Sequence, residues 1–263
     1  MTIRIVTDSA CDLPQYIVDQ YKISIVPLSV RFGEHEFIDR QDLTTEQFWK
    51  RCDSSPVLPE TAAPSPGQFE AEFRKLAAEG ATGIVMISLS GILSATMQSA
   101  ELAAKAVAGH ISVRVVDSRS GSMGQGITVI ACAKLAASGA SLDEVVATGE
   151  NLALRSKVWG ALDTLENLKK GGRIGGAKAM MASALSIKPI IEVVDGKIEE
   201  GGKQRTRSKA LAFLLEKVRD AGPIENLAVL QANCNDFEAF VESLRQISSG
   251  AIIVGDIGPI VGT

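Results

Sequence analysis

Short apolar runs alternate with helical segments along the first half of the chain, and this alternation constrains the fold more than any other feature. Strands separated by helices pair in parallel and carry helices on both faces of their sheet. We expect strands at residues 3–7, 23–30, 83–89 and 113–117, with a short edge piece at 34–39. We expect helices at residues 13–20, 45–50, 66–79, 94–107 and 124–137.

Beyond Ala140 the pattern changes and indicates antiparallel as well as parallel pairing. An Asp-Gly pair at 195–196 lies between two apolar runs, which predicts a hairpin over 187–194 and 197–200. The prediction is an α/β protein of two domains: a three-layer α/β/α domain with a mainly parallel sheet over residues 1–157, and an α/β domain with a mixed sheet over 158–263. Helices are also expected at 141–154, 203–218 and 236–247, and strands at 158–160, 227–231 and 251–257.

Composition excludes several classes of function. A net charge of −4 gives no basic footprint for nucleic acid or an anionic membrane, and a hydrophobic content of 46% is that of a globular protein. Four widely spaced cysteines and two histidines argue against zinc and against a disulfide framework. The first residues lead directly into a strand, and no apolar run is long enough to span a bilayer. We therefore expect a cytoplasmic monomer that binds no nucleic acid and contacts membranes only transiently.

The segment Leu165–Lys178, LENLKKGGRIGGAK, is unusually rich in glycine and in basic residues. It continues a helical run with leucines at 162, 165 and 168, and Arg173 stands between two glycine pairs. Glycines at a helix end allow a left-handed cap and a close approach of other atoms. An arginine there offers a planar fork for a carboxylate or phosphate. A basic helix end that only complements the helix dipole fits the same residues.

Standard catalytic patterns are absent. The Gly171–Lys178 stretch lacks the GK[ST] ending of a phosphate-binding loop, and the glycines at 121–126 are in the wrong order for a dinucleotide turn. His35 lies in a charged segment and His110 in a turn, so both are expected on the surface. The sequence favours binding over chemistry, with no catalytic residue, no metal and no cofactor.

Two hydroxyl residues stand at element ends, where parallel sheets bind ligands. Thr61 precedes a proline-rich approach to a helix, and Ser94 follows the strand at 83–89. A serine at a helix start, beside free N–H groups and the positive dipole end, is suited to an anion. Each residue alone also fits a plain helix cap. Together they suggest a carboxylate or phosphate that is held and not attacked.

Six segments, in order along the whole chain, resemble one known family. The segments are VTDSACDLP at Val6–Pro14, TAAPSPGQF at Thr61–Phe69, SGILSATMQSA at Ser90–Ala100, VVDSRSGSMGQG at Val115–Gly126, LENLKKGGRIG at Leu165–Gly175 and SIKPIIEVVDGKI at Ser186–Ile198. In these segments the sequence resembles the DegV family of bacterial fatty-acid-binding proteins, the FakB-type subunits of fatty acid kinase.

The resemblance implies two α/β domains with an acyl chain buried between them. It places the ligand carboxylate on Thr61 and Ser94, assisted by backbone N–H groups after the serine, at Ala95. Such proteins present the carboxylate to a separate ATP-dependent kinase, which makes an acyl phosphate for phospholipid metabolism. By analogy, kinase docking or a supporting role at the site falls on Arg173, Lys203, Arg205 and Arg207. Apolar and methionine side chains that are candidates to line the acyl tunnel, or are simply core, are Ile92, Leu93, Met97, Met180, Met181 and Leu185.

The sequence departs from the family pattern at three places. The SGT motif of the family is Ser94–Ala95–Thr96 here, and Met97 replaces an aromatic residue. Family members normally continue through a GTHTGPG-like segment whose histidine joins the carboxylate network, whereas this sequence ends at Gly258–Thr263. If that segment is absent, we expect weaker carboxylate binding. Two alternatives stay open: a dihydroxyacetone-kinase-like subunit, which would need a histidine for its covalent adduct, and a regulatory sensor of acyl ligands.

Overall fold

The computed structural model describes residues 2–263, apart from the side chains of 182–186. Its strands are β1 (Ile3–Asp8), β2 (Ser24–Val26), β3 (Ser29–Phe32), β4 (His35–Ile38), β5 (Glu60–Ala62), β6 (Gly83–Ser88), β7 (Val113–Asp117), β8 (Val158–Ala161), β9 (Lys188–Val194), β10 (Lys197–Gln204), β11 (Leu227–Gln231) and β12 (Ile252–Asp256). Its α-helices are α1 (Gln15–Tyr21), α2 (Thr45–Ser54), α3 (Pro66–Ala78), α4 (Thr96–Val107), α5 (Ser122–Ala137), α6 (Leu142–Arg155), α7 (Glu166–Lys170), α8 (Arg207–Asp220), α9 (Phe237–Arg245) and α10 (Pro259–Gly262). The 3-10 helices are η1 (Ser9–Cys11) and the longer η2 (Gly175–Ser186).

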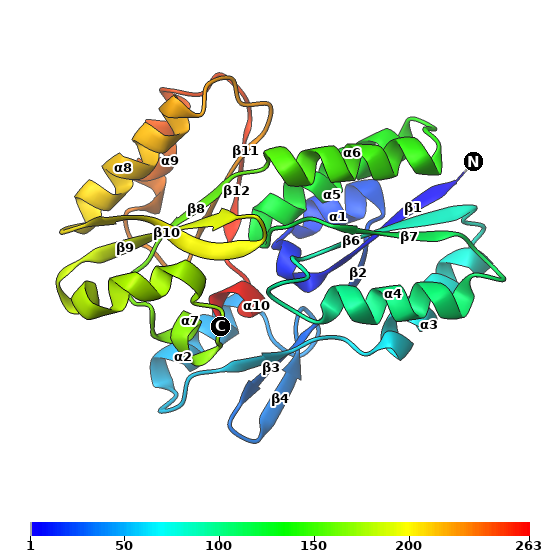
Figure 1. The fold of residues 1–263 in the computed structure, drawn as a ribbon, viewed down its shortest axis with the longest axis horizontal. Coiled ribbons are helices and arrows are strands. Elements are labelled where there is room, and N and C mark those ends of the chain that lie inside the picture. Colours follow the sequence, from blue (N-terminus) through cyan, green and yellow to red (C-terminus); the bar gives the residue numbers. More distant parts are fainter. Residues whose placement is uncertain (1) are drawn as a thin grey trace.

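A four-stranded parallel sheet of order β2-β1-β6-β7 forms the centre of the first half. Helices α5 and α6 lie on one side of it and α3 and α4 on the other (Figure 1). The side chains of β6 alternate between two cores: Val85 and Ile87 pack with α5 and α6, whereas Ile84 and Met86 pack with α3 and α4. Because both faces are buried, the strand is apolar throughout. The predicted three-layer α/β/α arrangement is confirmed.

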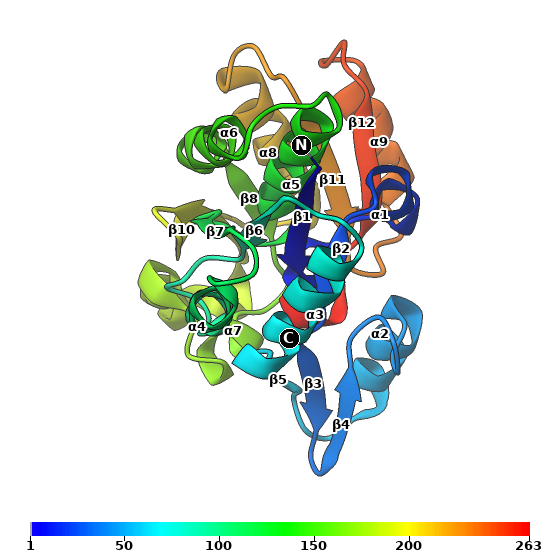
Figure 2. The same ribbon diagram turned by 90° about the vertical axis from the view of Figure 1, so that its right-hand side faces the viewer.

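The chain also forms three smaller sheets. Strands β4, β3 and β5 make an antiparallel sheet, whose β3–β4 hairpin projects from the lower edge of the molecule with α2 beside it (Figure 2). In the second half, β10, β9 and β8 pair antiparallel, and β11 pairs with β12 in parallel. The expected mixture of pairings is present, but it is divided between two sheets. Strands β11 and β12 pack against the core that contains α5, so this contact crosses the predicted domain division at residue 157. The division stays a prediction.

Local signals predicted several helix starts correctly. Ser65 caps α3 by accepting a hydrogen bond from the Gln68 N–H, and Pro66 occupies the first turn. Ser141 caps α6 in the same way, through the N–H of Glu144. In both cases the third helical residue bonds back to the cap, which satisfies two otherwise free backbone donors.

Four expected boundaries were wrong. The strand expected at 23–30 is divided at Pro27 into β2 and β3, which belong to different sheets, because proline has no N–H for a ladder. The helix expected from residue 94 begins at Thr96. The helix expected from Lys203 begins at Arg207, because β10 continues through a bulge at 200–202 to Gln204. The run near Leu165 is helical only over Glu166–Lys170.

Within the described residues, no helix is long and apolar enough to cross a membrane. The same part of the chain contains no cluster of three histidine, cysteine, aspartate or glutamate side chains that could hold a metal ion.

Asp12 links the last turn of the described chain, at Gly258, to the start of α5, at Ser122. Its buried carboxylate accepts hydrogen bonds from the Ser122 hydroxyl, at 2.7 Å, and from the Gly258 N–H, at 3.0 Å. Burial raises the pKa of Asp12 to about 7, despite these two hydrogen bonds, which lower it. The carboxyl group therefore carries its proton more readily in the folded protein than in the unfolded chain.

Replacing Phe73 with alanine tests the packing of the sheet against α3. Phe73 is fully buried, with its ring centroid 6.1 Å from that of Phe69. We expect Phe73→Ala to lower the free energy of unfolding by about 3–5 kcal/mol in urea denaturation, because it leaves a cavity. Arg74→Ala, on the exposed side of the same helix, should lower it by less than about 1 kcal/mol. Equal losses for the two variants would contradict this packing.

The raised pKa of Asp12 predicts that the free energy of unfolding depends on pH. Because its pKa is raised from 3.8 to about 7 on folding, its contribution is greatest at low pH and is lost as the pH rises between these values. We expect the free energy of unfolding of the wild type to fall relative to Asp12→Asn by up to about 1.4 kcal/mol per pH unit in this window.

Urea unfolding at pH 5 and pH 7 measures this difference. Asp143→Asn is the matched control, since the Asp143 carboxylate is exposed beside Arg114. A difference between wild type and Asp12→Asn that does not change with pH would show that Asp12 ionises normally in the folded state.

Candidate functional site

A buried carboxylate joins the ends of two neighbouring strands of the central sheet. Asp8, at the end of β1, accepts hydrogen bonds from the Ala10 N–H at 3.1 Å and from the Leu89 N–H, just beyond β6, at 2.8 Å. Its side chain is fully buried, and desolvation raises its pKa to about 6. Asp8 thereby fixes the point at which the chain leaves β6 and enters the loop 89–95.

The loop after β6 is held from several sides. The Ser90 N–H donates to the Ser120 carbonyl at 2.7 Å, and the Gly91 N–H donates to the Asp117 carboxylate at 3.3 Å. The Ser90 hydroxyl donates to the carbonyl of Gly196, at the tip of the β9–β10 hairpin, at 2.7 Å. A Cβ on Gly196, whose φ is +78°, would lie 2.6 Å from that hydroxyl oxygen. The hairpin predicted from the Asp-Gly pair thus docks directly on this loop.

Ser94 lies at the entrance to α4. Its hydroxyl is 2.9 Å from the Thr96 hydroxyl and accepts a hydrogen bond of 3.3 Å from the Thr96 N–H. Ala95, at the helix start, is exposed, and its N–H has no acceptor among the described residues. A half-buried hydroxyl therefore stands beside free donors at the positive end of a twelve-residue helix.

Thr61 lies in β5, a three-residue strand that we did not predict. It pairs with Val30 of β3 and is half-buried. Within the described part of the chain, its hydroxyl makes no hydrogen bond. Prolines flank this stretch, and its local sequence does not predict a strand. Strand β5 forms through its pairing with β3, which is distant in the sequence.

One segment contacts the chain immediately before both hydroxyl residues. At the end of α7, Lys170 donates to the Leu58 carbonyl at 2.5 Å and lies 3.6 Å from the Glu60 carboxylate. Arg173 donates through Nε to the Leu93 carbonyl at 3.1 Å and through Nη1 to its own segment, at Gly171. The glycine-rich segment identified from the sequence therefore connects the Thr61 strand with the Ser94 loop.

Three of the apolar candidates meet in one cluster. Leu93, Met180 and Met181 pack with side chains from α7, η2, β9 and β10, and Met180 is fully buried. Ile92 is 59% exposed, and Met97 is half-buried beside Gly91. The side chain of Leu185 lies outside the described residues. We call the group around Leu93, Met180 and Met181 the inter-sheet cluster.

The three basic candidates on β10 and at the start of α8 are in different settings. Arg207 makes two hydrogen bonds to the Asp236 carboxylate, at 2.5 and 2.7 Å, and this partner raises its pKa further. Lys203, on β10, lies 3.6 Å from Glu200. Arg205 is exposed and makes no ion pair within the described residues. Of the basic residues at 203, 205 and 207, Arg205 is therefore the one whose charge has no carboxylate partner among the described residues.

The histidines do not enter this site. His35 is exposed on β4, and His110 is exposed in the turn after α4. Neither is among the residues that contact Thr61, Ser94 or Arg173 in the described hydrogen bonds. Neither histidine is therefore placed at this site to form the covalent adduct that the dihydroxyacetone-kinase-like alternative requires.

The sequence marks Asp8 as the end of a strand and Lys170 as part of the glycine-rich segment, but we assigned neither residue a role. The signal for Asp8 is an acidic residue directly after an apolar strand, where a carboxylate caps a turn. The sequence does not distinguish Lys170 from the basic residues beside it, because its partners are at residues 58 and 60, more than a hundred positions earlier.

Comparisons with known proteins identify relatives along the whole chain. A protein from Streptomyces coelicolor with a DegV domain is 34% identical over 266 residues, covering 99% of this chain and 93% of that protein. A DegV family protein from Thermus thermophilus, described as binding fatty acid, is 32% identical to this chain, and the two structures match with a TM-score of 0.87. The match covers 100% of this chain and 95% of that one. DegV from Bacillus subtilis, described as a fatty acid binding protein, is 28% identical with a TM-score of 0.89, covering 100% and 94%.

The family model described as "Uncharacterised protein, DegV family" matches residues 2–263. The predicted family resemblance and the predicted α/β fold are both confirmed by these matches. The chain belongs to the DegV family.

Proposed function

We propose that this protein binds a long-chain fatty acid and holds its carboxylate at Thr61, Ser94 and the Ala95 N–H. The relatives from Thermus thermophilus and Bacillus subtilis are described as binding fatty acids, and their folds match this one over its whole length. We infer the same ligand class for this chain.

One observation carries the assignment: the segment at 170–173 contacts both hydroxyl-bearing stretches. A carboxylate that leaves water needs several hydrogen bonds to offset its desolvation. Thr61 offers a hydroxyl with no partner among the described residues, and Ser94 offers one at a helix start. The free Ala95 N–H adds a third donor and the favourable end of a helix dipole.

The acyl chain is assigned to the inter-sheet cluster. Burial of each methylene contributes roughly 0.8 kcal/mol, so a long chain needs an apolar region next to the headgroup site. Leu93 directly precedes Ser94 and belongs to this cluster, which links the two parts of the ligand. Methionine side chains adapt to different ligand shapes, and Met180 and Met181 supply them. Ile92, Met97 and Leu185 are proposed as further contacts of the acyl chain.

We further propose that a separate ATP-dependent kinase phosphorylates the bound acid. In that step a carboxylate oxygen attacks the γ-phosphorus of ATP, an acyl phosphate forms and ADP leaves. The described site offers hydroxyls and N–H groups but no histidine base, in keeping with a protein that presents its ligand. Basic side chains suit the phosphate-bearing partner, and the docking candidates are Arg173, Lys203, Arg205 and Arg207.

Ligand binding is tested first on the purified wild type. Native mass spectrometry should detect a co-purified acid of about 14–18 carbons, because a buried apolar site retains its ligand. A delipidated sample should then bind oleate with 1:1 stoichiometry. A protein that carries no acid and does not bind oleate would contradict the proposed function.

The headgroup assignment is tested by removing both hydroxyls. Thr61→Val with Ser94→Ala should weaken oleate binding about 10²- to 10⁴-fold, since each of the two hydrogen bonds to a charged group contributes about 1.5–3 kcal/mol. Ser138→Ala is the control, because its hydroxyl bonds only the Leu135 carbonyl at the end of α5. Unchanged affinity in the double variant would contradict the assignment. Tight binding without acyl phosphate formation, when a fatty acid kinase and ATP are added, would instead favour the regulatory sensor.

A further inference from the structure

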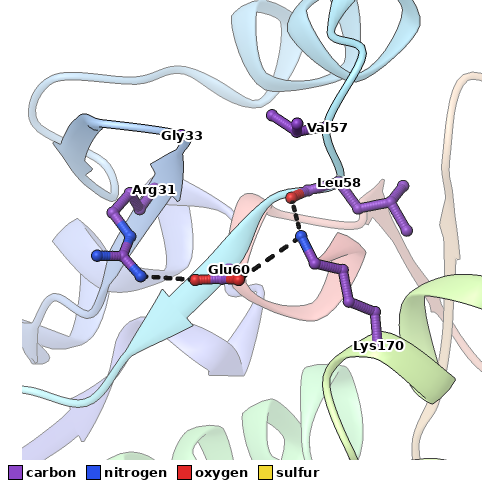
Figure 3. Close-up of a pocket in the computed structure, with 6 residues that line it drawn as sticks. All are labelled: Arg31, Gly33, Val57, Leu58, Glu60 and Lys170. Carbon is purple, nitrogen blue, oxygen red and sulfur yellow. Dashed lines mark hydrogen bonds and ion pairs between the residues drawn. The ribbon is translucent and has the colours of Figure 1, made fainter.

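A pocket of about 330 Å³ lies behind the strand that carries Thr61. It is lined by Arg31, Gly33, Val57, Leu58, Glu60 and Lys170 (Figure 3). Three charges meet across it, in the order cation, anion, cation. Arg31 contacts one Glu60 oxygen at 2.6 Å, and Lys170 lies 3.6 Å from the other, while also donating to the Leu58 carbonyl (Figure 3). Neither Thr61 nor Ser94 lines this pocket.

The pocket and the proposed headgroup site lie on opposite faces of one strand. In the register of β3 and β5, Arg31 pairs with Glu60 and Val30 pairs with Thr61. Successive side chains of a strand point to opposite faces. Thr61 therefore shares the face of Val30, which is fully buried, while Glu60 shares the exposed face of Arg31. The three charges hold the strand from the face opposite Thr61.

Strand β5 has little else to fix it. It is only three residues long, and it is the edge strand of the β4-β3-β5 sheet, so β3 supplies its ladder on one side. The preceding Val57 and Leu58 are 47% and 38% exposed. Lys170 reaches this stretch from α7, more than a hundred residues later, and contacts the Leu58 carbonyl and the Glu60 carboxylate.

Lys170 and Arg173 contact two different parts of the site. Gly171 and Gly172 separate them, and Gly172 has a φ of +72°, a conformation that favours glycine. Lys170 contacts Glu60, directly before Thr61, and Arg173 contacts Leu93, directly before Ser94. The separation of the two hydroxyls is therefore coupled to the position of one short segment.

We infer that Lys170 is a positioning residue for the carboxylate site: through Glu60 and the Leu58 carbonyl it fixes the strand of Thr61, and so sets the spacing between the Thr61 and Ser94 hydroxyls. This inference rests on the proposed function. Lys170 does not touch the ligand; it acts through Thr61. Because the three side chains remain 38–56% exposed, the ion pairs add little to global stability, and their loss leaves the fold intact.

Lys170→Met tests the inference through ligand affinity. Oleate binding should weaken about two- to fivefold, the range expected when exposed ion pairs are removed. Lys170→Arg should restore most of the affinity. The matched control is Lys169→Met, on the same helix, whose charge lies 4.0 Å from Glu166; it should bind oleate like the wild type. The difference between Lys170→Met and the control should shrink in 1 M salt, where the screening length is about 3 Å.

A double-mutant cycle separates positioning from a general structural role. In the Thr61→Val background, Lys170→Met should have no further effect on oleate affinity, because the hydroxyl that it positions is absent. Equal effects of Lys170→Met with and without Thr61 would overturn the inference, and so would affinity equal to that of the control. In both cases the wild type still binds oleate and the proposed function stands. A wild type that binds no oleate overturns the proposed function and this inference with it.

Discussion

The hydrogen bonds of the Asp8 carboxylate are the interaction on which the arrangement of the site depends. One oxygen accepts from the backbone after β1 and the other from the backbone after β6, inside a fully buried environment. A buried carboxylate with its acceptors occupied fixes the chain more firmly than an exposed one, since loss of either partner leaves an unsatisfied group. From this point the loop with Ser94 leaves the sheet, and the Ser90–Gly196 contact then positions the β9–β10 hairpin.

From this anchor, the second half of the chain closes over the first in two places. The hairpin tip docks on the loop after β6, and the α7 segment reaches both this loop and β5. The inter-sheet cluster fills the space beside Leu93 with side chains from α7, η2, β9 and β10. Hydroxyls and a free N–H group thus adjoin an apolar cluster, which is the combination that the proposed fatty acid would need. The proposed ligand class and the geometry agree on this point.

The sequence predicted what depends on local signals and on burial pattern. The start of α3 followed from Ser65 and Pro66, and the central sheet followed from apolar runs that are buried on both faces. Features that depend on distant partners were not predictable. Strand β5 exists only by pairing with β3, and β10 extends to Gln204 because its partner β9 is long enough to continue the ladder past a bulge. Thr61 and Ser94 were identified as candidates from their types and positions, whereas the contact of Lys170 with the Thr61 strand appears only in three dimensions.

A crystal structure of the delipidated protein soaked with an eighteen-carbon acid tests the central claim most directly. The account predicts a carboxylate within hydrogen-bond distance of the Thr61 and Ser94 hydroxyl oxygens, with the acyl chain entering the inter-sheet cluster beside Leu93 and Met180. An acid whose carboxylate lies away from both hydroxyls, or whose chain lies outside this cluster, would contradict it.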